Sequence, residues 1–316
     1  MGLKSAVAFF KGIPDRTRDI YSFDEGWMYT SALSLDAAYP VPHMLGKFGL
    51  TASDLDAAVT RFAGEPRVEA GDGTLVLKSG RLKSSIDLVD VDEPSQALHK
   101  TVPNPDAIPE NLLEAIERVL PFAASDGTWQ KSVELSKGKV RAIDSYHGAS
   151  AEVPGLDLGD PLPLPADTLK FIVSREAPIG IKRLPSALAI FWASGAWVLL
   201  RLSTQAWPSL ADSIFAKAKD AETPVAFTDE WREAFVDVAA LGDGYIDLAP
   251  DGLTAKTAHA EARAELPTGA AGSSRWRRAN LADVMKVATH WDPDAPAPAP
   301  FRGDGIVGIV AGVRTK

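Results

Sequence analysis

Hydrophobic residues along this chain follow two different periods, and each period predicts one kind of element. Apolar residues three or four positions apart form one face of an amphipathic helix, whereas alternating or continuously apolar short runs are typical of strands. The helical spacing occurs at residues 3–10, 52–62, 109–120, 165–173, 228–240 and 280–288. Strand-like runs lie between them, for example at 74–77, 189–192 and 197–200. The expected N-caps of three helices are Thr51, Thr228 and Asn280.

A tight turn with a glycine separates neighbouring strand-like runs, and this turn recurs along the whole sequence. Glycine reaches the positive φ angles that short hairpin loops require. The turns end at Gly26, Gly73, Gly138, Gly195, Gly252 and Gly305. A helix followed by strands around a glycine turn is therefore a unit that the chain repeats six times. A generic α+β protein with hairpins is the alternative, because glycine turns on their own are common.

Two polar segments divide the repeated units into three pairs. Residues 92–105 contain three prolines, and residues 216–224 are polar and charged, so both are expected to be linkers. The sequence thus predicts an α+β fold with three repeated domains at residues 1–100, 101–215 and 216–316. Each domain would place two helices on one face of an antiparallel sheet.

Composition narrows the class of protein. Hydrophobic residues make up 46% of the 316 positions, which is enough for a packed core. Cysteine is absent, which excludes disulfides, thiolate metal ligands and cysteine nucleophiles. No apolar run is long enough for a signal-peptide core or a membrane span, so we expect a soluble cytoplasmic protein without a membrane partner. The net charge of −9 argues against a chain that is basic throughout, but not against one with a local basic surface.

The middle of the sequence carries the most specific motifs. Residues 108–120 begin with Ile-Pro and continue as a helix, residues 142–149 read AIDSYHGA, and residues 204–208 read TQAWP. Further on, residues 249–253 read APDGL. These segments resemble the bacterial DNA polymerase III β sliding clamp family, in which an ATDGHRLA-like strand, an IP-initiated helix, a DGxFP-like segment and an SPDGL-like turn occupy those places. The resemblance extends over nearly the whole chain, with the first domain matched only by its order of helices and hairpins.

Several positions depart from the family pattern. Ser145 replaces a glycine, Gly148 replaces a leucine, and the C-terminal residues 310–316 differ from the Met-Pro-Met-Arg-Leu-like ending. The chain is also shorter than typical bacterial members. The sequence is therefore identified as a divergent member of the family, and a phage origin would fit this divergence.

The resemblance implies a ring. Family members close head to tail, first domain against third, so that two three-domain chains form a homodimer whose helices line a central channel. The implied function is that of a DNA sliding clamp, a polymerase processivity factor that encircles double-stranded DNA without sequence specificity. Its implied partners are duplex DNA, a DNA polymerase and a clamp loader, the two proteins being bound through short peptide motifs.

Basic side chains on the channel surface would contact phosphates without reading bases, which permits sliding. The densest basic cluster is the segment 274–278, Ser-Arg-Trp-Arg-Arg, for which an ordinary solvated loop is the alternative interpretation. The helices at 109–120 and 228–240 are rich in acidic residues, which runs against a uniformly basic channel. The candidate DNA-binding residues are Lys4, Lys11, Arg16, Arg18, Arg61, Lys170, Arg175, Lys182, Arg183, Arg275, Arg277, Arg278 and Lys286.

The second implied surface is an apolar pocket for partner peptides, between the second and third domains of the family fold and next to the C-terminal strand. Gly148 in place of leucine predicts a pocket of altered shape. Ile143 and Ile309 could also be ordinary core residues. Carried over by position, the pocket would involve Ile143, Ser145, Gly148, Pro208, Ile214, Ile309, Ala311, Val313 and Arg314.

Catalytic motifs are missing from the sequence. It contains no phosphate-binding loop ending in Gly-Lys-Ser/Thr, no His-Glu-x-x-His and no dinucleotide-binding glycine fingerprint. The five histidines show no metal-ligand spacing, so we expect neither an enzyme nor a bound metal or cofactor. The main alternative function is a ring- or tube-forming structural protein, for example a viral one, without DNA sliding. An enzyme on an unrecognised α+β fold is the second alternative.

Overall fold

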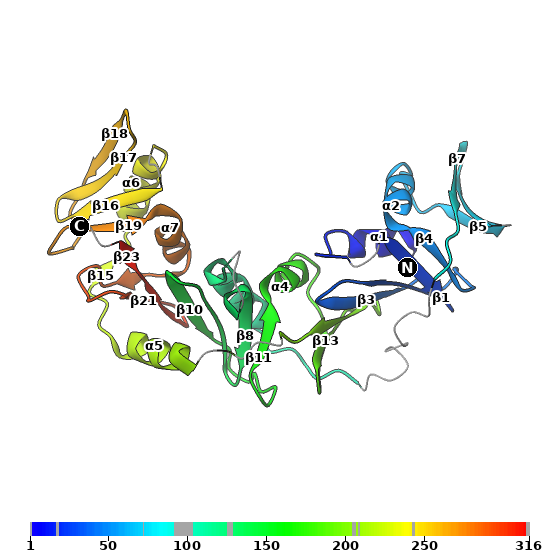
Figure 1. Cartoon of the computed structure of the whole chain (residues 1–316), viewed down its shortest axis with the longest axis horizontal. Helices are drawn as coiled ribbons and strands as arrows, with labels where there is room; N and C mark the ends of the chain where they lie inside the picture. Colours follow the sequence, from blue (N-terminus) through cyan, green and yellow to red (C-terminus); the bar gives the residue numbers. More distant parts are fainter. Residues whose placement is uncertain are drawn as a thin grey trace. The chain divides into compact units, whose positions relative to one another are not determined.

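The computed structural model describes residues 2–16, 19–71, 73–91, 104–124, 129–203, 207, 209–241 and 244–313. Its contacts divide the chain into two compact units that exchange parts of the middle region. Unit 1 combines residues 1–108 with 167–202, and unit 2 combines residues 109–166 with 203–316. The predicted α+β class is confirmed, since helices and antiparallel strands alternate along both units (Figure 1).

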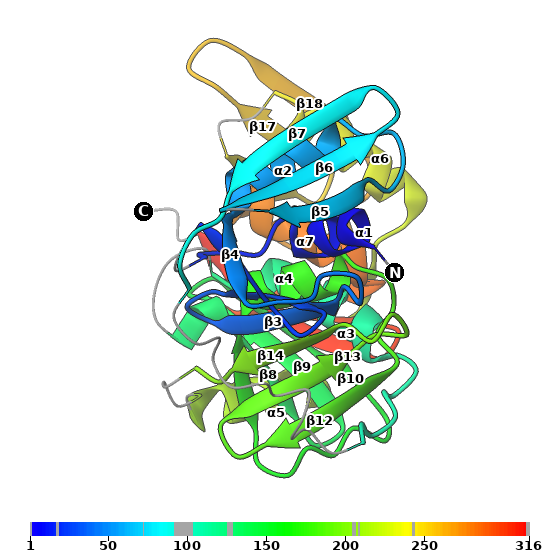
Figure 2. The same cartoon turned by 90° about the vertical axis from the view of Figure 1, so that its right-hand side faces the viewer.

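Unit 1 is built on a seven-stranded antiparallel sheet and a separate three-stranded sheet. In sheet order the large sheet contains β12 (Gly180–Leu184), β13 (Ala187–Phe191), β14 (Trp197–Arg201), β3 (Leu35–Pro40), β2 (Trp27–Ser31), β1 (Ile20–Asp24) and β4 (Phe48–Thr51). The small sheet contains β5 (Arg67–Gly71), β6 (Thr74–Ser79) and β7 (Leu82–Asp87) (Figure 2). Its helices are α1 (Leu3–Phe10), α2 (Ala52–Thr60) and α4 (Ala166–Val173).

Aromatic contacts hold α1 and α4 against the large sheet. The ring of Phe9 on α1 lies 5.4 Å from that of Tyr39 on β3, 6.2 Å from that of Phe171 on α4 and 5.1 Å from that of Trp192. Such edge-to-face packing adds to the stabilisation that burial of the rings already supplies. The two helices α1 and α4, far apart in sequence, therefore share one core.

Unit 2 contains an eight-stranded and a five-stranded antiparallel sheet. In sheet order the first holds β11 (Leu162–Pro165), β8 (Ser132–Ser136), β9 (Lys139–Ile143), β10 (His147–Glu152), β22 (Ile306–Val310), β21 (Ala299–Gly303), β20 (His290–Trp291) and β15 (Val225–Ala226). The second holds β18 (Glu261–Glu265), β17 (Gly252–Lys256), β16 (Tyr245–Ala249), β19 (Ser274–Arg277) and β23 (Gly312–Val313). Its helices are α3 (Leu112–Val119), α5 (Ser209–Asp220), α6 (Asp229–Ala239) and α7 (Arg278–Val287).

The repeated unit predicted from the glycine turns is visible as three consecutive antiparallel strands. The described residues form six such three-stranded units, β1–β3, β5–β7, β8–β10, β12–β14, β16–β18 and β20–β22. Strand pairing within each unit is antiparallel, and the glycine turns lie between strands of the same unit. Five of the glycines have a positive φ, whereas Gly252 lies inside β17, where an added Cβ would approach the carbonyl oxygen of Ala264 to 2.3 Å.

Third strands join neighbouring units into the large sheets. Strand β3 pairs antiparallel with β14, and β10 pairs antiparallel with β22, so each large sheet contains two of the three-stranded units. Residues at these junctions are largely buried. The third strands β7 and β18, by contrast, lie at sheet edges and are mostly exposed.

Two sequence predictions about helices are corrected. The predicted linker at 216–224 is wrong at its start, because α5 includes residues 216–220 and crosses the predicted domain boundary at 215 and 216. Asn280 lies within α7, whose N-cap is Arg277. The N-cap at Thr228 is confirmed by a hydrogen bond from the Trp231 amide to its side chain. Most of the linker at 92–105 lies outside the described residues.

Candidate functional surfaces

Several of the candidate cations cap the C-termini of neighbouring helices. In unit 1 the Nζ of Lys4, on α1, donates to the carbonyl oxygens of Phe62 and Ala63 after α2, at 2.6 and 2.9 Å. Arg175, after α4, donates to the carbonyl oxygens of Ala8 and Lys11 at the end of α1. Burial lowers the pKa of Arg175. A positive charge at a helix C-terminus offsets the helix dipole, so these side chains stabilise the fold whatever else they bind.

Unit 2 repeats this arrangement between α6 and α7. Arg232 on α6 donates to the carbonyl oxygens of Met285 and Ala288 at the end of α7. In return, Arg278 at the start of α7 donates to the carbonyl oxygen of Ala239 at the end of α6, at 2.7 Å. Arg232 was not among the residues predicted from the sequence, because its position on an acidic helix gave no signal.

Lys11 and Arg61 are placed differently from the capping residues. Within the described residues, neither side chain makes a hydrogen bond or ion pair with another side chain, and both line a hollow of about 350 Å³ between α1 and α2. Lys170 and Lys286 are exposed and pair with Asp167 and Asp283 three residues before them, at 3.0 and 2.8 Å. Exposed pairs of this kind are weak and exchange readily with other anions.

The cluster at 274–278 does not form one surface. Successive residues of a strand point to opposite faces, and Trp276 packs against Trp291, 5.1 Å away, in the core shared with α6. Arg275 and Arg277 therefore project from the sheet face opposite the helices. Arg275 forms a two-pronged ion pair with Asp247, at 2.6 and 2.8 Å, which raises its pKa. The guanidinium of Arg277 lies 3.6 Å from the ring centroid of Tyr146.

The remaining candidate cations have local partners. Lys182 pairs with Asp106 at 3.1 Å, and Arg183 donates to the carbonyl oxygens of Leu184 and Ala187. Arg16 donates to the Tyr21 hydroxyl at 3.0 Å. Arg18 lies outside the described residues.

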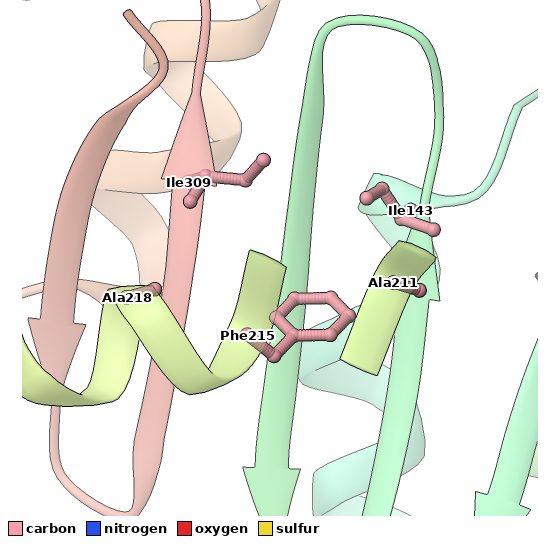
Figure 3. Close-up of a cluster of buried hydrophobic side chains, with 5 residues drawn as sticks. All are labelled: Ile143, Ala211, Phe215, Ala218 and Ile309. Carbon is pink, nitrogen blue, oxygen red and sulfur yellow. The ribbon is translucent and has the colours of Figure 1, made fainter. Parts of the chain in front are cut away.

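The candidate peptide-pocket residues gather only in part. Ile143 on β9 and Ile309 on β22 belong to one apolar cluster with Ala211, Phe215 and Ala218 of α5 (Figure 3). Ile214 packs against this cluster. The place expected to be an open pocket is thus covered by α5, and the Phe215 ring lies between the two isoleucines in the view of Figure 3.

Gly148 explains the tight packing beneath α5. It lies on β10, paired with Ile143 on one side and Ile309 on the other. An added Cβ would approach Cγ1 and Cβ of Ile143 to 2.7 and 2.9 Å, so Ile143 fills the space that a larger residue at 148 would need. The altered pocket shape that Gly148 predicts stays a prediction.

The other predicted pocket residues lie around this cluster or away from it. Ser145 is exposed and accepts a hydrogen bond from Gln130 at 3.2 Å. The Ala311 amide donates to the Tyr146 carbonyl oxygen at 2.6 Å. Val313 belongs to the five-stranded sheet, where it pairs with Arg275. Pro208 and Arg314 lie outside the described residues.

Sequence reasoning missed a polar network beside the apolar cluster. Arg141 on β9 and Glu134 on β8 form an ion pair whose side chains are 4% and 1% exposed, with Nε of Arg141 3.0 Å from Oε1 of Glu134. Nη1 of Arg141 donates to Asp212 on α5 and holds the pKa of that carboxyl below its usual range. Alternation places Glu134, Arg141 and Ile143 on the same sheet face, a signal that was present in the sequence.

A second network joins β10 to α7. Nδ1 of His147 lies 2.9 Å from Oδ1 of Asp144, and its Nε2 lies 3.7 Å from Oδ2 of Asp283. Burial alone would lower the pKa of His147, but its interactions with the two carboxylates outweigh burial and raise it. His147 is therefore positioned to hold α7 on the sheet.

Metal and membrane sites are not found in the part of the chain that the structure describes. There, no group of three or more His, Asp or Glu residues is placed to hold a metal ion. No described helix is long and apolar enough to cross a membrane.

Comparisons with known proteins find similarity in structure but not in sequence. No protein-family model matches the sequence, and no curated protein matches it. Solved structures do match over nearly the full length. The sliding clamp of Caulobacter crescentus is 15% identical, with a TM-score of 0.76 over 99% of this chain and 98% of that chain. The DNA polymerase β subunit of Streptococcus pyogenes is 16% identical, with a TM-score of 0.76 over 99% and 97%.

A third match is the DNA polymerase III subunit β of Pseudomonas aeruginosa, which is 14% identical, with a TM-score of 0.75 over 99% of this chain and 98% of that chain. Agreement over both whole chains includes every repeated unit described above. The fold predicted from the resemblance is therefore confirmed: this chain has the fold of the bacterial DNA polymerase III β sliding clamps.

Proposed function

We propose that the chain is a DNA sliding clamp, a non-catalytic ring that encircles duplex DNA and tethers a DNA polymerase. The observation that carries this proposal is the full-length agreement with sliding-clamp structures, repeated units and connecting strands included. A fold shared over the whole chain favours a shared mechanical role. In this proposal the three domains are residues 1–100, 101–215 and 216–316, with α5 connecting the last two.

Unpaired sheet edges support closure by a second copy. Both junctions inside the chain join the third strands of two repeated units. Strands β7 and β18 are the third strands that lack such a partner in the described residues. Pairing β7 of one copy with β18 of another would cover both edges and add the same kind of junction. Because this contact is head to tail, two copies with two such contacts close into a ring.

The DNA surface in this proposal lies on the helices. The side chains best placed to bind phosphates are those with weak ion pairs or none, namely Lys11, Arg61, Lys170 and Lys286. Lys4, Arg175 and Arg278 would add to the local positive charge while capping helices. Arg275 and Arg277 would contribute little, since they project from the opposite face of their sheet.

Replacing both Lys11 and Arg61 with alanine is expected to weaken DNA binding and to flatten its salt dependence. Removing one cation that neutralises a phosphate lowers the slope of log K against log salt by about 0.9, so a change of roughly 1 to 2 is expected for the pair. Fluorescence anisotropy with labelled duplex DNA at several salt concentrations measures both quantities.

The matched control for this test removes two positive charges from hairpins, as Lys137→Ala with Lys256→Ala. Both side chains are exposed and paired with nearby acids. An equal effect of the control pair would mean that DNA responds only to net charge. The absence of any DNA binding by the wild-type chain would favour the alternative, a ring-forming structural protein.

A further inference from the structure

The first strand of a three-stranded unit has an outer edge, and in five of the six units that the described residues form, a segment that precedes a helix covers this edge. Strand β4, before α2, pairs with β1, and β11, before α4, pairs with β8. Likewise β19, before α7, pairs with β16, and β15, before α6, pairs with β20. On β12 the cover is Asp106, before α3, which exchanges two backbone hydrogen bonds of 2.7 and 2.9 Å with Ile181. Covering the first strand with an extended segment is therefore a regular part of this fold.

Strand β5 is the exception. It is the edge strand of the small sheet that lies toward α1 (Figure 2), and within the described residues no strand pairs with its outer side. By the rule of the other five units, its cover would come directly before α1, but the first described residue, Gly2, is already the N-cap of that helix. Four of the five residues of β5 are exposed. Its outer N–H and C=O groups therefore form a template on which another strand can add.

A pocket beside β5 lies where an apolar side chain of an added strand would be buried. Its volume is about 370 Å³, and its apolar lining comes from the start of α1, the loop after β3 and the start of β5, namely Leu3, Val41, Met44, Pro66 and Val68. In unit 2 the segment before α6 shows what such a place holds. There Phe227 is 6% exposed, with its ring 5.1 Å from that of Trp231 and 5.2 Å from that of Trp291. The pocket beside β5 therefore suits one apolar anchor residue.

Charge at the rim of the pocket favours an acidic residue in the added strand. Arg67, the first residue of β5, is exposed and makes no ion pair with any described residue. Glu69, two residues further on, is already paired with Lys78 of β6. On the covered edge of β12, Lys182 pairs with Asp106 of the covering segment at 3.1 Å. An acid beside Arg67 would reproduce that pair.

We propose that the outer edge of β5 and its pocket receive an extended segment of a partner protein. The segment adds a strand to the small sheet, buries an apolar side chain in the pocket and places an acidic residue beside Arg67. Main-chain hydrogen bonds supply affinity in this mode of recognition, and the pocket supplies specificity. This proposal goes beyond the clamp function, because it requires neither DNA nor the closure of a ring through β7.

A peptide with the sequence of residues 222–229 tests this proposal, because it is the chain's own example of a covering segment. It carries Val225 and Phe227 at alternate positions and an acidic residue at each end. The labelled peptide is titrated into the full chain, and fluorescence anisotropy measures binding. We expect saturable binding that falls at least about tenfold when the peptide carries Phe227→Ala, since a buried aromatic anchor dominates such contacts. The absence of saturable binding, or equal binding of the two peptides, would overturn the proposal.

N-methylated peptides distinguish strand addition from simple apolar attraction. In unit 2 the Phe227 amide donates to the carbonyl oxygen of Thr289 at 2.8 Å, so the amides of Val225 and Phe227 face the neighbouring strand and that of Ala226 faces away. Methylation of the Val225 and Phe227 nitrogens should therefore abolish binding, whereas methylation of the Ala226 nitrogen should preserve it. Loss of binding to the same degree in both peptides would contradict strand addition.

Hydrogen exchange with and without the peptide locates the site. Amides of β5 should exchange more slowly in the complex, and those of the other free edges, β7 and β18, should not change. Protection at β7, at β18 or only at β20, where the peptide would replace its parent segment, would overturn the proposal.

The charge requirement is tested with Arg67→Glu, which should weaken binding of the peptide at least about threefold. Its matched control is Arg81→Glu, an exposed residue in the turn between β6 and β7 of the same sheet, which should leave the affinity unchanged. Equal effects of the two variants would refute the acidic residue beside Arg67. All these measurements are made without DNA, so their failure would leave the clamp function untouched, and a chain that never stays on DNA could still bind the peptide at β5.

Discussion

Replacing Trp291 with alanine is expected to lower the free energy of unfolding by about 3–5 kcal/mol, the usual cost of removing a buried tryptophan. Trp291 is fully buried on β20, and its ring lies 5.1 Å from Trp276, 5.2 Å from Phe227 and 5.9 Å from Trp231. The substitution leaves a cavity where α6 and both sheets of unit 2 meet. Urea unfolding followed by circular dichroism measures the loss as a lower midpoint.

Val236→Ala is the matched control for this prediction. Val236 lies on α6, the helix that also carries Trp231, but its side chain is 66% exposed. Its replacement is expected to change the free energy of unfolding by less than about 0.5 kcal/mol. Similar midpoints for the two variants would show that the aromatic cluster is not the core of this part of the fold.

Arg141→Met is expected to cost about 3–5 kcal/mol of stability for a different reason. The substitution keeps most of the apolar volume but leaves the Glu134 carboxylate, which is 1% exposed, without its partner. A buried charge without compensation is far more costly than the lost attraction between the pair. The measurement is the free energy of unfolding in urea.

The double variant Glu134→Leu with Arg141→Met is the control for this mechanism. Because no uncompensated charge remains, it is expected to recover most of the stability that Arg141→Met loses. The Asp212 interaction with Arg141 stays broken in both variants, so their difference reports on the buried pair alone. Equal destabilisation by the single and double variants would place the cost elsewhere, in the packing of Arg141 against Trp207 and Phe215.

Periodicity carried most of the prediction of the fold. Helices α1, α2, α3, α4, α6 and α7 coincide with stretches of regular apolar spacing, because each buries a continuous face against a sheet. Helix α5 shows no regular apolar spacing, because it does not bury a continuous apolar face. It buries two alanines and one phenylalanine, and its remaining positions are mostly polar or charged, so its second half has the composition of a linker.

The candidate sites were less predictable than the fold, because charge in a sequence does not reveal its partner. Arg275 and Arg278 are three residues apart, yet one forms an ion pair across a strand and the other caps a helix. The pairing of β3 with β14 could not be predicted from the sequence either, because many other elements lie between these two strands in the chain. Strand alternation, applied to Glu134 and Arg141, is the signal that would have revealed the network beside α5.

Retention on end-blocked DNA tests encirclement most directly and needs no loader. The chain is incubated with linear duplex DNA biotinylated at both ends, so that closed rings can thread on, and streptavidin then blocks the ends. After a wash at high salt, which removes simple electrostatic binding, the account predicts that protein stays on the DNA and is released when a restriction enzyme cuts between the blocks. Protein that washes off despite blocked ends, or that is retained equally when added after blocking, would contradict encirclement.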